Sequence, residues 1–162
     1  MGILKDINRF RIQQEDKLFS WLHRISLPLA RIAFFAVFFW FGTLKMMELS
    51  PSIGVIHTIH EHTAWFIPWE LYVFLFGAYE CLIGVLFLVP GRERWVLYLL
   101  IPHVVTTFAP LLLAPKLTWK AFLIPNMIGQ YIIKNVVIVS LAIFVTVAGS
   151  APRRSLVQTA DR

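Results

Sequence analysis

The chain has 162 residues, of which 58% are apolar, and its formal net charge is +6. Its mean hydropathy of +0.71 excludes an ordinary soluble domain, because a small core cannot bury so many Phe, Leu, Ile and Val side chains. The composition also argues against nucleic-acid binding, because the basic residues lie at the edges of apolar segments and form no patch interleaved with aromatics.

The N-terminal segment, residues 1–26, has the pattern of an amphipathic helix. Apolar residues recur at near-helical spacing between charged neighbours: Leu4, Ile7, Phe10, Leu18, Trp21 and Leu22. The segment has no continuous apolar region of the kind found in a secretory signal peptide. We therefore expect an interfacial helix on the cytoplasmic leaflet, and a partly ordered tail that contacts a partner subunit fits the pattern equally well.

Four apolar segments are long enough to cross a bilayer, which takes about 20 helical residues. They extend from Leu27 to Met47, Leu71 to Val89, Trp95 to Ala114 and Phe122 to Val147. We predict an all-α fold, in which the membrane domain, residues 27–149, is a four-transmembrane-helix bundle. It follows the amphipathic segment and precedes a cytoplasmic tail, residues 150–162.

The distribution of Lys and Arg predicts the orientation of these spans. Basic residues gather in the N-terminal segment, at Arg92 and Arg94 in the second connection, and in the C-terminal tail. The opposite side has only Lys116 and Lys120. The positive-inside rule therefore predicts a multi-pass protein of a bacterial inner membrane with both termini in the cytoplasm.

Residues 48–70 form the first connection, and they contain histidines and aromatic residues. We expect an interfacial loop that anchors the protein through Trp65, Phe66 and Trp69. His57, His60 and His62 are minor candidates for a metal site or a pH sensor, but their spacing matches no zinc signature, and we predict no metal site.

Ionisable residues within the spans are the strongest candidates for function, because each costs a few kcal/mol to insert. Glu80, His103 and Lys134 are each near the middle of a different predicted span. We expect Glu80 and Lys134 to form an ion pair, because an unpaired charge in hydrocarbon is costly. Such a pair either fixes the register of the helices or lines a cavity that shares a proton or binds a polar head group.

A second group of polar residues lies nearer the outer surface, on the side of the membrane opposite to the cytoplasm. Lys45 and Glu48 end the first span, and Gln130, Lys134 and Asn135 lie in the fourth. Small residues in the same spans would let the helices approach closely: Gly42, Gly77, Gly84 and Gly129. We therefore predict a polar intramembrane cluster, a possible substrate or proton site, that comprises Lys45, Glu48, Glu80, His103, Gln130, Lys134 and Asn135. No residue is assigned a catalytic role.

These motifs resemble those of the DoxX-like four-helix membrane proteins, including their YkgB-type branch, over about residues 28–148. A pattern W-x-G-x-x-K-x-x-E falls on Trp40, Gly42, Lys45 and Glu48, and G-x-x-E-x-x-x-G falls on Gly77, Glu80 and Gly84. The last helix is similar through Gln130, Tyr131, Lys134 and Asn135. The resemblance implies membrane-associated redox or stress-response assemblies, and it makes quinone a possible cofactor.

Three functions follow from these expectations. The first and favoured one is an accessory or structural subunit of a larger membrane complex, of respiratory or redox type, whose partners are the lipid bilayer and other membrane subunits. The second is a quinone-reactive small subunit of a membrane oxidoreductase, and the third is a small-solute transporter or channel. No phosphate loop, nucleophile elbow or metal knuckle is present, and the chain lacks the marks of a self-sufficient enzyme.

Overall fold

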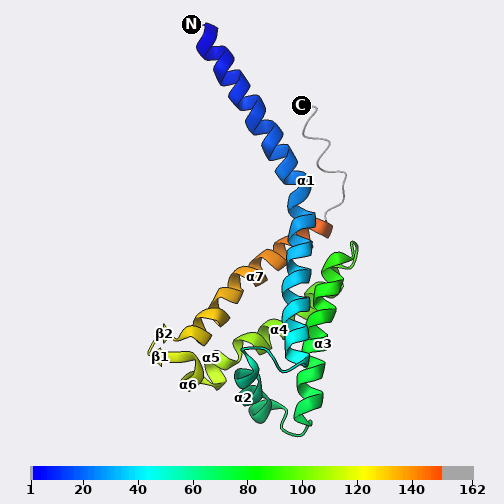
Figure 1. Cartoon of the computed structure of the whole chain (residues 1–162), viewed down its shortest axis with the longest axis vertical. Coiled ribbons are helices and arrows are strands. Elements are labelled where there is room, and N and C mark those ends of the chain that lie inside the picture. The colour runs from blue at the N-terminus through cyan, green and yellow to red at the C-terminus, as the bar shows by residue number, and fades with distance from the viewer. Residues whose placement is uncertain (1, 151–162) are drawn as a thin grey trace.

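The structure, a computed structural model, describes residues 2–150 and the side chains of residues 15–149 except Glu93. The predicted tail from residue 151 onwards and the side chains of Leu4, Ile7 and Phe10 lie outside this description. Figure 1 shows a mostly helical protein in which one helix is much longer than the others.

That long helix is α1, Gly2–Met46, and it joins the predicted amphipathic segment to the first span. The separate interfacial helix that we expected is therefore not observed. Pro28 is the one strong helix breaker in the joining region, and the helix continues through it. A proline within a helix removes one backbone hydrogen bond and bends the axis, but it need not end the helix. At about 1.5 Å per residue, 45 residues extend about 67 Å, roughly twice the hydrocarbon thickness.

The C-terminus of α1 is closed by a Schellman motif. The Leu49 N–H donates to the Leu44 carbonyl at 2.8 Å, and the Glu48 N–H donates to the Lys45 carbonyl at 2.9 Å. Glu48 has a φ of 55°, a left-handed conformation that glycine usually adopts at this position. The motif turns the chain sharply just after Lys45.

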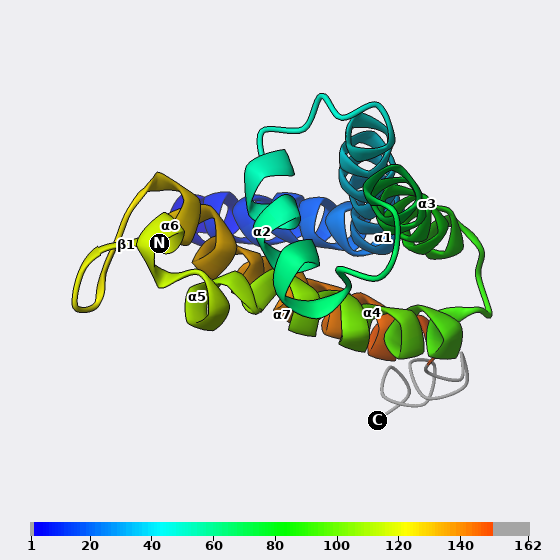
Figure 2. The ribbon, with the colours of Figure 1, turned by 90° about the horizontal axis from the view of Figure 1, so that it is seen from below.

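The first connection is not only a loop, because it contains α2, Ile53–Thr63. One face of α2 is buried through Val55, Ile56 and Ile59, and the helix contacts α3 and α5. Figure 2, which looks onto this end of the protein, shows α2 lying across the ends of the longer helices. Trp65 and Phe66, which follow α2, are exposed, as an interfacial anchor requires.

The second and third predicted spans agree closely with the observed helices. The second is α3, Trp69–Leu88. The third comprises α4, Glu93–Phe108, and α5, Pro110–Leu113, which continues it after Ala109.

The fourth span begins later than predicted, because residues before it form other elements. These are α6, Pro115–Thr118, followed by an antiparallel hairpin of β1, Trp119–Ala121, and β2, Ile124–Pro125. Asn126 then caps the fourth span, α7, Met127–Ser150, by accepting a 3.1 Å hydrogen bond from the Gly129 N–H. Phe122 therefore lies in the hairpin and not in the span.

The four long helices contact one another in a ring, in which α1 packs on α3, α3 on α4, α4 on α7 and α7 on α1. A shared apolar core receives two residues from each helix: Phe34, Phe38, Ile83, Phe87, Val96, Leu100, Ala142 and Val145. The contact of α1 with α3 is the most extensive. The first part of α7 lies away from α1 and α3, so the ring is closed mainly at the end where α3 and α7 finish (Figure 1).

By length and composition, four helices among residues 15–149 can cross a membrane: Glu15–Met46, Trp69–Leu88, Arg94–Leu113 and Met127–Gly149. Many of their large apolar side chains are exposed, as contact with lipid requires. The chain is therefore a multi-pass membrane protein with four spans.

Candidate functional site

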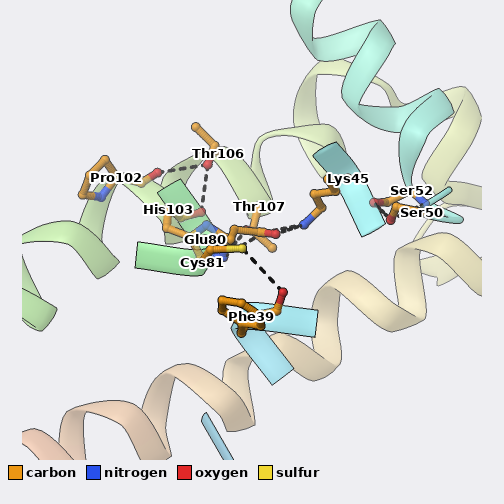
Figure 3. A network of polar contacts seen from close by, with 10 residues as sticks. All are labelled: Phe39, Lys45, Ser50, Ser52, Glu80, Cys81, Pro102, His103, Thr106 and Thr107. Atoms are coloured by element: carbon orange, nitrogen blue, oxygen red, sulfur yellow. Dashed lines mark hydrogen bonds and ion pairs between the residues drawn. The ribbon is translucent and has the colours of Figure 1, made fainter. Parts of the chain in front are cut away.

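The most deeply placed ionisable groups gather between α1, α3 and α4. Glu80, in the middle of α3, has only 4% of its surface exposed, and the ammonium of Lys45 in the last turn of α1 donates hydrogen bonds to its carboxylate. His103 of α4 lies on the other side, with its Nε2 3.7 Å from Oε1 of Glu80 (Figure 3). We call Lys45, Glu80 and His103 the triad.

The imidazole of His103 has few polar neighbours. Its Nε2 lies 3.4 Å from Oγ1 of Thr107, and its Nδ1 is buried without a hydrogen-bond partner among the described residues. Three aromatic rings surround it, with centroids 5.3 Å away for Phe38, 6.2 Å for Phe76 and 6.5 Å for Tyr79. A buried nitrogen without a partner costs free energy, so this atom is the clearest unsatisfied point of the site.

Two glycines explain why Lys45 reaches Glu80. Lys45 follows Gly42 by three residues on α1, and Glu80 follows Gly77 by three residues on α3. A Cβ on Gly42 would lie 2.6 Å from the carbonyl oxygen of Gly77, so the two backbones meet at a distance that only glycine permits. The close crossing places the two charged side chains side by side, one turn beyond the contact.

The electrostatics of the triad follow from its burial. Moving a carboxylate and an ammonium out of water costs several kcal/mol each, and their mutual attraction offsets this cost only where the contact is direct. The Lys45 ammonium is in direct contact with Glu80, so this pair carries no net charge. His103 is close enough to become a second partner of the same carboxylate, so the site can hold a proton in more than one arrangement.

The predicted ion pair between Glu80 and Lys134 is wrong, because Lys45 occupies the position expected for Lys134. Lys134 and Gln130 are exposed on α7, and Nζ of Lys134 lies 5.5 Å from the ring centroid of Tyr131. Asn135 is half-buried. Neither the start of α7 nor its rotation was predicted correctly: Lys134 was expected near the middle of the fourth span and is the eighth residue of α7.

Glu48 also lies outside the triad. It caps α1, and its Oε2 accepts a 3.2 Å hydrogen bond from Nε1 of Trp69 at the start of α3. The structure therefore brings together Lys45, Glu80 and His103, and it separates Glu48, Gln130, Lys134 and Asn135 from them. The three-residue spacing from Gly42 to Lys45 equals that from Gly77 to Glu80, but the sequence does not show that these two glycines meet.

Sequence reasoning did not identify a column of rings along α3 that connects the triad to α2. The ring of His60 lies 4.8 Å from that of Tyr72, Tyr72 lies 6.3 Å from Phe76, and Phe76 lies 6.2 Å from His103. The positions 69, 72, 76 and 79 recur every three or four residues, which is a helical face. This periodicity was visible in the sequence as an aromatic stripe.

The histidines of α2 bind separate partners. Nε2 of His60 lies 2.8 Å from the Ile67 carbonyl, Nδ1 of His62 lies 2.7 Å from the Thr58 carbonyl, and His57 lies 3.5 Å from the Glu61 carboxylate. Among the residues with described side chains, no group of three or more His, Cys, Asp or Glu could hold a metal ion.

No protein-family model, no curated protein and no solved structure matches this chain. The resemblance to the DoxX-like proteins therefore rests on the motifs alone.

Proposed function

We propose that this chain is an accessory subunit of a larger membrane complex, of respiratory or redox type. The observation that carries the proposal is the length of α1. Arg31 donates a 3.2 Å hydrogen bond from Nη1 to the Phe87 carbonyl, near the last turn of α3. Leu27 and Ala30 still pack against the core, so α1 leaves the other spans just before Leu27.

The part of α1 before Leu27 extends away from the bundle (Figure 1). From Gly2 to Ser26 it measures about 38 Å at 1.5 Å per residue. Among its described side chains, those of residues 15–26, four large apolar ones are exposed: Leu18 by 53%, Phe19 by 67%, Trp21 by 56% and Leu22 by 40%. An apolar stripe on a projecting helix is typical of a docking element, because its exposure to water would be unfavourable.

The redox character of the complex is supported by two features of the chain. One is the motif resemblance to the DoxX-like proteins, and the other is the buried triad, a place where protons can be held inside the membrane.

The test is purification in mild detergent followed by native mass analysis. We expect the wild-type chain to carry a partner subunit, and we expect Trp21→Glu to release it. Trp65→Glu is the matched control, since Trp65 is also exposed but lies at the α2 end of the molecule. A wild-type chain that purifies without any partner would overturn the proposal.

A second candidate, a quinone-reactive small subunit, is favoured by the surroundings of His103. A quinone head group is planar and carries carbonyl acceptors, and His103 combines a buried Nδ1 that lacks a hydrogen-bond partner with flanking rings of Phe38 and Phe76. The residues present therefore fit such a group. When bound, a quinone would accept two electrons from the parent complex together with two protons.

In this candidate, the chain's own residues hold and deliver protons. Lys45 and His103 would donate hydrogen bonds to a carbonyl oxygen, and Glu80 would hold the proton that compensates the charge. We expect quinone among the lipids extracted from the purified protein, and Glu80→Gln should abolish quinone reduction by the parent complex. Unchanged turnover in this variant would count against the role.

A further inference from the structure

The exposed polar stripe of α7, Gln130, Tyr131 and Lys134, is explained neither by the triad nor by the docking helix. Lys134 is the eighth residue of α7, about 11 Å from the start of the helix at 1.5 Å per residue. Its side chain is exposed, and so are those of Gln130 and Tyr131 one turn earlier. No described acidic side chain lies within ion-pair distance of Lys134.

Lys134 is exposed in the first part of α7, which lies away from α1 and α3. The face of α7 that packs inward carries Ile132, Ala142 and Val145, all buried. The outward face continues from Lys134 to Val137, 70% exposed, and Phe144, 67% exposed. A cation in a helix that crosses hydrocarbon costs roughly 2.5–3.5 kcal/mol near the centre and less towards the ends. An exposed Lys134, about two turns into α7, keeps part of this cost unless another molecule covers it.

We propose that this face of α7 binds a transmembrane helix of a partner subunit that carries a carboxylate at the depth of Lys134. The inference rests on the proposed function as a subunit of a larger complex, and it names the chemistry of one partner. A carboxylate in the partner's span would neutralise the cation, and the amide of Gln130 would offer it a second hydrogen bond. The apolar residues from Val137 onwards would complete the helix contact.

A second copy of this chain fits the face less well. Symmetric pairing of α7 with α7 would place Lys134 near Lys134, and like charges in a low dielectric repel strongly. The carboxylate at the middle of α3, Glu80, is only 4% exposed and is already held by Lys45. A lipid phosphate also fits less well. It lies at headgroup level, about one and a half to two turns of α7 from Lys134, whereas a carboxylate in a partner's span can lie at the same depth as the lysine.

The experiment uses a photoreactive amino acid in place of Val137, in the full chain and in native membranes. We expect a crosslink to a partner span whose sequence contains Asp or Glu. The crosslink should fall at least tenfold in Lys134→Met and should return in Lys134→Arg, which keeps the charge. The same photoreactive residue at Phe74, an exposed position of α3, is the matched control and should be insensitive to Lys134→Met.

Several outcomes would overturn the inference. A crosslinked span without Asp or Glu, a crosslink to lipid or to a second copy, or an unchanged crosslink in Lys134→Met would each contradict it. Native mass analysis of the same preparation separates the two proposals. An intact complex without the Val137 crosslink refutes the α7 contact alone, whereas a wild-type chain without any partner refutes the subunit proposal and this contact with it.

Discussion

Glu80 receives both of its cationic neighbours from other helices. Lys45 comes from α1 and His103 from α4, so the carboxylate connects three of the four spans. Substitution of one member of this group should lower the free energy of unfolding, because the charge that remains is buried and has no water to replace the lost contact.

Removal of Lys45 should destabilise the protein strongly. We expect Lys45→Met to lower the free energy of unfolding by about 3–5 kcal/mol, because the Glu80 carboxylate loses its direct partner. The double variant with Glu80→Met should recover most of that loss, since an apolar pair needs no compensation. Unfolding by SDS titration in mixed micelles, followed by tryptophan fluorescence, measures both effects.

The control for this prediction is Lys120→Met. Lys120 is an exposed lysine in the β1–β2 hairpin, and its removal should change stability by no more than about 0.5 kcal/mol. Equal effects at Lys45 and Lys120 would show that the triad does not contribute to stability.

Among the elements, the crossing of α1 and α3 determines the position of the site. Gly42, Gly77 and Gly84 all lie in this contact, and a Cβ on Gly84 would lie 3.0 Å from the backbone nitrogen of Phe39. Gly129 has a different role from the one predicted, because it packs against Thr118 of α6 and not against another span. The small residues therefore bring one helix pair together, and the remaining helices pack around that pair.

A methyl group in this crossing should separate the two helices. We expect Gly42→Ala to cost about 1–3 kcal/mol, because its Cβ would meet the backbone of α3 and cannot be accommodated by a rotamer change. Displacement of α1 should also lengthen the contact of Lys45 with Glu80. The same SDS titration measures the loss.

Gly54 provides the matched control for Gly42. It lies in α2, and a Cβ added to it would meet no atom within 4 Å, so Gly54→Ala should be neutral or stabilise the helix by up to about 1 kcal/mol. A loss at Gly54 equal to that at Gly42 would contradict the role of the close crossing.

At the scale of the whole molecule, the connections divide between two ends. The link from α3 to α4 lies at one end together with the end of α7, and α2, α6 and the β1–β2 hairpin lie at the other (Figure 1). Consecutive spans that run in opposite directions require this arrangement, and the positive-inside rule predicts that the end with Arg92 faces the cytoplasm.

Cysteine labelling tests this orientation. In a Cys81→Ser background, Lys120→Cys should react in intact cells with a maleimide that does not cross the membrane. Arg92→Cys should react only after the membrane is opened, because both positions are exposed but lie at opposite ends. The reverse pattern would refute the predicted orientation, and equal labelling from outside would refute the four-span arrangement.

Much of this architecture could be predicted from local properties of the sequence. Apolar length, proline positions and charge bias each act within one segment, so the spans, the even topology and the burial of Glu80 and His103 followed without knowledge of the fold. The continuation of α1 through Pro28 was not predicted, because the pattern change near residue 26 indicated a boundary where the backbone has none.

The tertiary structure alone decided which lysine pairs with Glu80. Lys45 and Lys134 are both cations within spans, and hydropathy assigns them no direction around their helices. The backbone contact of Gly42 with Gly77 turns Lys45 towards Glu80, while the packing of α7 on α4 leaves Lys134 on the outside. The sequence by itself determined that four segments can cross a membrane, because this depends on the length and composition of each segment. The pairing of their charged residues depended on the rotation and crossing of whole helices, which arise only when the spans pack together.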